Sequence, residues 1–210
     1  MRSSVPMPGN PWPHDMQIEV DDSPHTLIEL LWVREAWDLR PVGDDLPPLL
    51  DAPAAKDARR HVDTHGWAED WPTIWRDAVA HAGTLRDPTL FAALQASANG
   101  SQQRRELLTK MVGPSARDRF IDAFDDSWSE WSTAQSATRR AERTLPLEEH
   151  PERRSLDALI PAWERGLLKI VTIPVRGPHT RRIGPHVLLT THAIRADPVA
   201  YAQALASFTS

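Results

Sequence analysis

Apolar residues recur along most of the chain with the three- and four-residue spacing of helices that bury one face. Ser or Asp often precedes these segments, and Gly or Pro follows them, as at helix ends. The pattern predicts about seven helices. The candidate segments for these helices number eight and cover residues 24–39, 54–65, 67–83, 87–100, 101–112, 115–143, 155–166 and 197–208. The expected N-cap residues include Ser23, Asp70, Asp87, Ser115 and Asp197.

Three shorter segments have the alternating or β-branched pattern of strands. They are residues 16–20, 167–175 and 186–194. The two later segments predict a small, mainly C-terminal antiparallel sheet. A strand at 16–20 that joins this sheet would tie both ends of the chain into one unit. The expected fold class is therefore α+β and helix-dominated.

Proline and charge divide the chain into three parts. Residues 1–14 contain four prolines and predict a flexible tail. Residues 15–145 predict a mainly helical body, and residues 146–210 predict a C-terminal α/β lobe packed on it. The segment TLPLEEHPERR, 144–154, has the composition of a charged linker. We expect body and lobe to form one structural unit.

Composition narrows the classes of function. The chain has no cysteine, which excludes disulfides, thiolate nucleophiles and Cys-ligated zinc. No apolar run approaches the roughly 18 residues of a membrane span, and the N-terminal residues lack the apolar core of a signal peptide. These features favour the cytoplasm. The excess of arginine over lysine is typical of a high-GC bacterium.

Charge is unevenly distributed along the chain. Residues 1–100 hold 8 basic and 16 acidic side chains, whereas residues 101–210 hold 16 basic and 13 acidic ones. The acidic first half argues against general coating of nucleic acid. The basic second half favours a localised anionic or acidic partner, most simply a protein. A localised nucleic-acid contact is the less favoured alternative.

Several motifs of catalytic chemistry are missing from the sequence. It contains no G-x-S-x-G elbow and no glycine-rich phosphate loop. With nine glycines, most of them at expected helix ends, we expect no nucleotide cofactor and no other cofactor. The sequence assigns no oligomeric state.

A metal site is one alternative. On a helix over 54–65, Asp57, His61 and His65 would lie along one stripe, one turn apart. Two imidazoles and a carboxylate can hold a metal ion. Val62 stands where a metalloprotease has its glutamate base. A solvated helix face is the favoured interpretation.

A nuclease is the second alternative. The residues Arg60-His61-Val62-Asp63-Thr64-His65 resemble the R-[NHD]-x-x-x-H element of the HEPN superfamily of helical nucleases and nucleotide-binding proteins, and so do residues Arg76 to His81. The resemblance implies a dimeric ribonuclease. Arg60 and His65, or Arg76 and His81, would then organise the phosphate and transfer protons.

Nine tryptophans are many for 210 residues. Trp67, Trp71 and Trp75 are spaced four residues apart, which predicts a buried stripe. Because tryptophan is favoured at binding hot spots, the excess points to Trp12 or Trp37 on a partner surface.

The favoured binding site is the segment RGPHTRRIGPH, 176–186. Arg176, His179, Arg181 and Arg182 would place several hydrogen-bond donors on one exposed loop between two strands. Two Gly-Pro steps would stiffen its ends. The sequence therefore predicts a non-enzymatic interaction or regulatory module that binds an anionic or acidic partner through this basic loop.

Overall fold

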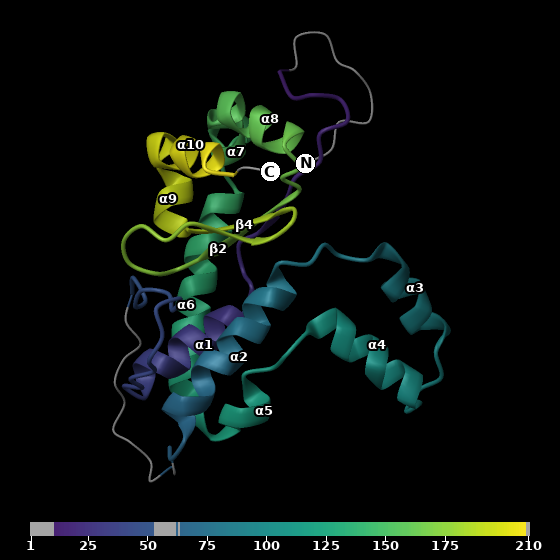
Figure 1. Ribbon diagram of the computed structural model, residues 1–210, viewed down its shortest axis with the longest axis vertical. Helices are drawn as coiled ribbons and strands as arrows, with labels where there is room; N and C mark the ends of the chain where they lie inside the picture. The colour runs from purple at the N-terminus through teal and green to yellow at the C-terminus, as the bar shows by residue number, and fades with distance from the viewer. Residues whose placement is uncertain (1–10, 53–61, 63, 209–210) are drawn as a thin grey trace.

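The computed structural model describes residues 11–52, 62 and 64–208. These residues form ten α-helices and a four-stranded sheet, so the α+β prediction is confirmed (Figure 1). The α-helices are α1 (His25–Ala36), α2 (Trp67–Ala82), α3 (Pro88–Ala96), α4 (Gln102–Val112), α5 (Arg117–Phe120), α6 (Asp126–Arg143), α7 (Pro151–Arg154), α8 (Leu156–Glu164), α9 (His192–Ala196) and α10 (Pro198–Ala206). The strands are β1 (Glu19–Asp21), β2 (Lys169–Ile173), β3 (Arg181–Gly184) and β4 (Val187–Thr191), and the 3-10 segments are η1 (Ile121–Ala123) and η2 (Leu147–Glu149).

The sheet is mixed, with strand order β1-β2-β4-β3. β1 pairs with β2, which confirms that the N-terminal strand joins the C-terminal sheet. The prediction that the two long C-terminal strands pair antiparallel is wrong, because β2 and β4 run parallel. Residues 181–184 form a strand of their own that pairs antiparallel with β4. β3 thus occupies one side of β4, and β2 takes the other side.

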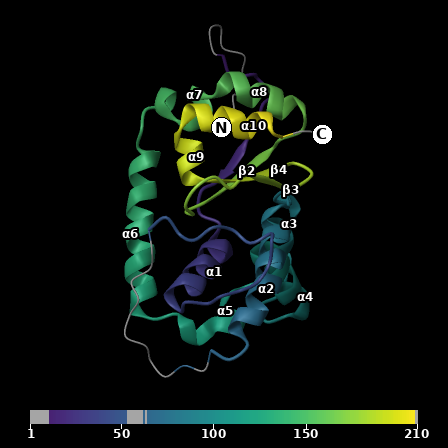
Figure 2. The same cartoon turned by 60° about the vertical axis from the view of Figure 1, so that its left-hand side comes forward.

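Both faces of the sheet are covered by helices, which explains why every residue of β2 and β4 is buried. Val171 and Leu189 face a core that they share with α1 and α2. Ile170 and Leu188 face a second core, shared with α8 and α10. Figure 1 shows these helix layers on opposite sides of the strands, and Figure 2 shows α6 running along one side of the molecule past both layers.

The predicted tryptophan stripe is confirmed. Trp67, Trp71 and Trp75 are all buried in the core beneath α1. The indoles of Trp71 and Trp75 stack with centroids 5.3 Å apart, and Trp71 Nε1 donates to the Leu30 carbonyl at 2.8 Å. The stripe therefore anchors α2 to the central helix.

The two tryptophans expected on a partner surface both pack against core residues. Trp12 is 4% exposed, and its indole donates to the Met16 carbonyl at 2.9 Å. Trp37 is partly buried and packs edge-on against Trp67. Burial of Trp12 contradicts the expectation for that residue, whereas a partner contact at the partly buried Trp37 stays a prediction.

Some of the predicted N-cap residues cap their helices, and others do not. Asp87 and Asp197 cap α3 and α10 as predicted, each accepting backbone N–H groups. Ser23 does not cap α1, because the helix begins at His25 with Pro24 at the N-cap position and no side-chain cap. Asp70 lies inside α2, which begins three residues earlier after Gly66 turns the chain at φ 75°.

Two segments differ from their predicted form. The long helix predicted over 115–143 divides into α5, η1 and α6, because Asp125 accepts the Ser127 N–H and starts a new helix. The linker predicted over 144–154 contains η2 and α7, and its Glu152 is buried. Of the predicted tail, residues 1–10 lie outside the described residues, as does most of the helix predicted over 54–65.

Among the helices that the structure describes, none combines the length and apolar character needed to cross a membrane.

A close backbone contact between α2 and β3 provides a test of this packing. A Cβ added to Gly83 would lie 2.1 Å from the carbonyl oxygen of Ile183. We predict that Gly83→Ala lowers the free energy of unfolding by about 2 kcal/mol or more, because backbone must move to relieve the overlap. Gly43→Ala is the control, since its nearest atoms belong to side chains that can rotate away. Equal urea-unfolding midpoints for the two variants would contradict this packing.

Candidate binding cleft

A cleft of about 550 Å³ opens between the body of the protein and a projecting pair of helices. We call residues 85–112, which contain α3 and α4, the arm. Figure 1 shows the arm standing away from the sheet and its helix layers. The start of α1, the end of α2, both ends of β1 and the first residue of β2 form the opposite wall.

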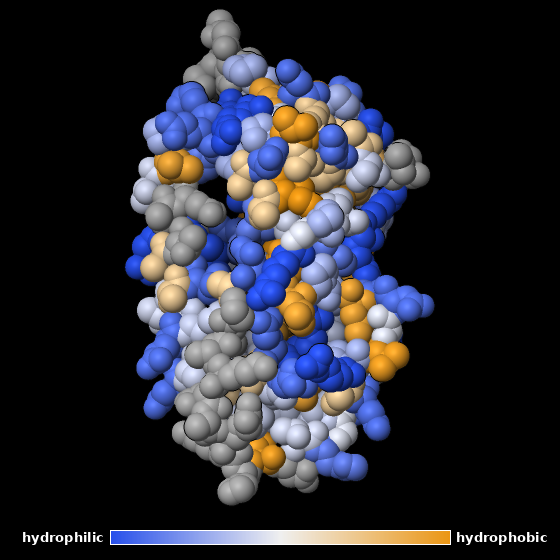
Figure 3. Space-filling view, turned by 90° about the vertical axis from the view of Figure 1, so that its left-hand side faces the viewer, coloured by the Kyte–Doolittle hydropathy of each residue, from blue (hydrophilic) through white to orange (hydrophobic). Residues whose placement is uncertain are grey.

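The arm exposes large apolar side chains. Phe91 is 59% exposed and Val112 is 60% exposed, and both line the cleft together with Leu85 and Met111. Of the arm, which the structure describes in full, Leu94 and Ser97 are the buried residues. On the face turned away from the arm, hydrophobic side chains form patches separated by polar ones (Figure 3). The arm thus gathers apolar surface beside a hollow, as binding sites do.

A buried lysine fixes the first connection between body and arm. Lys169 is 7% exposed, and its Nζ donates to the carbonyl oxygens of Ala82 at 3.1 Å and Thr84 at 3.3 Å. A cation at the last carbonyl groups of α2 satisfies unpaired acceptors and complements the helix dipole. The chain therefore leaves α2 toward the arm in a defined direction.

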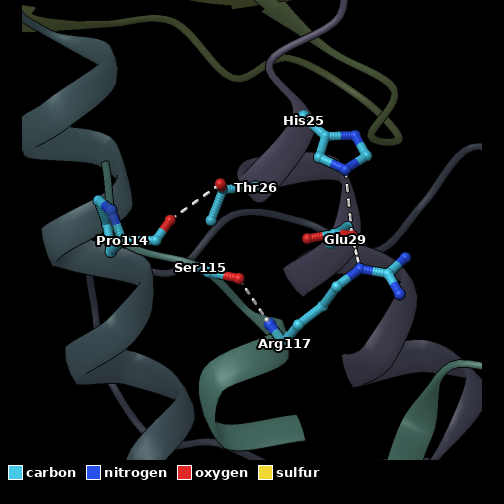
Figure 4. Close-up of polar contacts among 6 residues, drawn as sticks. All are labelled: His25, Thr26, Glu29, Pro114, Ser115 and Arg117. Atoms are coloured by element: carbon cyan, nitrogen blue, oxygen red, sulfur yellow. Dashed lines mark hydrogen bonds and ion pairs between the residues drawn. The ribbon is translucent and has the colours of Figure 1, made fainter. Parts of the chain in front are cut away.

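A polar clamp fixes the second connection (Figure 4). Glu29 on α1 is 1% exposed, and its Oε1 accepts from Arg117 Nε at 2.7 Å. The same oxygen lies 3.2 Å from His25 Nε2. Thr26 Oγ1 donates to the carbonyl oxygen of Pro114 at 3.0 Å, just beyond the arm. We call these five residues the clamp, because they join the start of α1 to the end of the arm.

The clamp favours a protonated His25. Its hydrogen bond to Glu29 is the main cause that raises the pKa of His25 above 6.5, and burial and Arg117 oppose it. The Arg117 guanidinium also lies over the Phe124 ring at 4.2 Å. A histidine oriented by a carboxylate resembles a general-base pair, but here Arg117 and His25 share one buried carboxylate, and Arg117 ties two segments together. The arrangement therefore joins the start of α1 to the chain just beyond the arm.

The predicted basic loop does not present its side chains as one cluster. Arg181 Nη1 donates to the Asp45 carbonyl at 3.2 Å, and Arg182 donates to the carbonyls of Gly184 and Pro185. Arg176 lies 4.0 Å from Glu35. Each arginine thus makes contacts within the chain, and binding through this loop stays a prediction.

His179 is the fourth residue of that loop. Burial and then Arg181 lower the pKa of His179, so the uncharged ring is favoured at neutral pH. A neutral, partly buried imidazole adds little to attraction for an anion.

The residues of the nuclease alternative are separated where they can be placed. Arg60 lies outside the described residues, whereas His65 is described and exposed. Arg76 makes a two-bond ion pair with Asp45, at 2.9 Å for each bond. His81 lines the cleft and packs against Gly113. The structure does not bring Arg76 and His81 together, and RNA cleavage stays a prediction.

Of the three residues of the metal alternative, the structure describes only His65. Asp57 and His61 lie outside the described residues. Within the part of the chain that the structure describes, no group of three His, Asp or Glu side chains could hold a metal ion.

A second polar cluster joins α7 to α9 and α10. The buried Glu152 carboxylate accepts two bonds from Arg195, at 2.8 and 2.9 Å, and one from the Tyr201 hydroxyl at 3.1 Å. His192 lines a cavity of about 130 Å³ beside them. Burial, then Arg139 and Arg195, lower the pKa of His192 to about 4. The cluster fastens the C-terminal helices and holds an uncharged histidine next to two arginines.

The sequence did not indicate the residues that shape the cleft. Glu29 is the one acid in a run of apolar residues, LIELLWV, and that isolation is a signal for a buried, paired carboxylate. The apolar residues of the arm were expected to face a core. Neither feature forms a motif.

The chain matches no protein-family model, no curated protein and no solved structure.

The clamp predicts a specific titration. In Glu29→Gln the carboxylate charge is lost, so we expect the pKa of His25 to fall toward 6.5. NMR titration of the His25 ring protons measures it. Glu69→Gln, an exposed change on α2, is the control and should leave the His25 titration unchanged. An unaltered His25 titration in Glu29→Gln would contradict the clamp.

His192 predicts loss of stability in acid. Because the pKa of His192 is about 4 in the folded protein and near 6.5 when unfolded, the unfolded chain binds more protons between these values. Stability should therefore fall as the pH drops from 6.5 toward 4, by about 3 kcal/mol from this group. His192→Gln should lose less stability over the same range in urea titrations. Parallel pH profiles for the two proteins would refute the assignment.

Proposed function

We propose that the chain is a non-catalytic protein-interaction module that binds its partner through the cleft and the arm. One observation carries the proposal: the apolar side chains of the arm are exposed beside a cleft that they themselves line. Contiguous apolar surface of this kind marks interaction sites on monomeric proteins. A regulatory role in the cytoplasm belongs to the same proposal.

The energetics of the arm support a bound state. α3 has 9 residues and α4 has 11, and helices of this length are marginal in water without tertiary packing. Ordering each residue costs about 1–2 kcal/mol, and burial of Leu94 and Ser97 offsets little of that cost. A partner that covers Phe91 and Val112 would supply the missing apolar burial.

The lining of the cleft defines the chemistry of the partner. Glu19 and Asp21 lie on the body side, Arg86 and Lys110 lie on the arm side, and apolar groups lie between them. An amphipathic helical segment with charges of both signs fits such a groove. The partner need not be wholly acidic, because the cleft carries both charges.

This site differs from the basic loop expected from sequence. The loop arginines make contacts within the chain, whereas Phe91 and Val112 remain exposed. Side chains that already bond within the chain would have to break those bonds to bind a partner, whereas exposed side chains without such bonds would not. The cleft therefore replaces residues 176–182 as the favoured site.

A photoreactive side chain can test the site. With p-benzoylphenylalanine at position 91, we predict cross-linked adducts of defined mass in the cells from which the chain comes, because a partner would cover that side chain. The control is the same residue at Val199, which is 69% exposed on α10. Equal labelling at both positions, or none at position 91, would refute the proposal.

A further inference from the structure

The charged groups on the two walls of the cleft are not paired with each other. Glu19 lies on the body wall, and Arg86 and Lys110 lie on the arm wall. In the part of the chain that the structure describes, these three side chains have no hydrogen-bond or ion-pair partner. The charged side chains of each wall are therefore available to a partner that binds between the walls.

The arm carries the features that the cleft requires of its partner. α4 combines apolar side chains, Leu108, Met111 and Val112, with charges of both signs, Arg105, Glu106 and Lys110. These apolar groups are between 38% and 60% exposed. A second arm would bring cations to the carboxylates of the body wall and apolar groups to the apolar lining.

We propose that the occupant of the cleft is the arm of a second copy of this chain, in a twofold dimer in which each arm enters the other's cleft. This inference rests on the function proposed above and names its partner. In a twofold arrangement every contact occurs twice, so Glu19 of each copy meets Lys110 of the other. Formation of the dimer then buries the exposed apolar side chains of both arms.

The size of the cleft limits how deeply the second arm enters. An 11-residue helix is about 16 Å long and about 10 Å wide, and so occupies roughly 1,300 Å³. The cleft holds about 550 Å³. One face of α4 enters the cleft, and the rest of that helix packs against the first copy's arm. The dimer contact therefore consists of a charged cleft contact and an apolar arm-to-arm contact.

Sedimentation equilibrium of the full chain tests the dimer. We expect twice the chain mass, and Phe91→Asp should raise the dimer dissociation constant at least about tenfold. Val199→Asp is the matched control, since Val199 is at least as exposed as Phe91 but lies on α10. A monomer mass up to about 0.1 mM overturns the inference.

Charge reversal tests which residues meet across the dimer. Glu19→Lys and Lys110→Glu should each weaken self-association at least about tenfold, because like charges then meet at both contacts. Mixing the two variants restores opposite charges at both contacts, so the mixture should dimerise within about threefold of the wild-type constant. Rescue also shows that both variants are folded. No rescue on mixing overturns the pairing of Glu19 with Lys110.

The outcomes separate this inference from the proposed function. A monomeric chain whose position 91 cross-links to a different protein overturns the second copy as partner and leaves the interaction module intact. Absence of cross-linking at position 91 refutes the module itself. A cross-linked adduct of twice the chain mass supports both.

Discussion

The arrangement of the cleft depends on one buried carboxylate. Glu29 lies within the central helix α1, where an unpaired negative charge would cost several kcal/mol. Arg117 and His25 offset this cost, and Arg117 lies four residues beyond Gly113, where the arm rejoins the body. The pairing of Glu29 therefore also positions the arm. The need to pair Glu29 in the core thus also restrains the arm at the surface.

Periodicity predicted most helices and the tryptophan stripe, because burial of one helix face leaves a direct mark on the sequence. It did not predict the order of the sheet. β2 and β4 are buried on both faces, so their sequences lack the alternation of apolar and polar residues and carry no information on strand direction. The short strand β3, with Arg181 and Arg182 at its start, has no apolar alternation, so its sequence predicts a loop.

The site was harder to predict than the fold, because it depends on which groups remain unsatisfied after folding. The arginines of residues 176–182 looked available in sequence, yet Arg181 donates to the Asp45 carbonyl and Arg182 to the nearby carbonyls of Gly184 and Pro185. Phe91 and Val112 looked like core residues, yet the fold provides no layer to cover them. The local sequence pattern indicates whether a residue favours burial or exposure, whereas tertiary contacts determine whether it is buried or paired in the folded protein.

Both connections of the arm are held by contacts between a cation and an acceptor, and the two contacts respond differently to pH. Lys169 bonds to carbonyl groups, which do not titrate in the physiological range. Glu29 is shared with His25, whose raised pKa means that this contribution is present at low pH and is lost as pH rises through that value. Reciprocity then requires that a partner favouring the clamped arm must also favour protonation of His25. A partner bound in the proposed site would in this way be linked to the charge on His25 through Glu29.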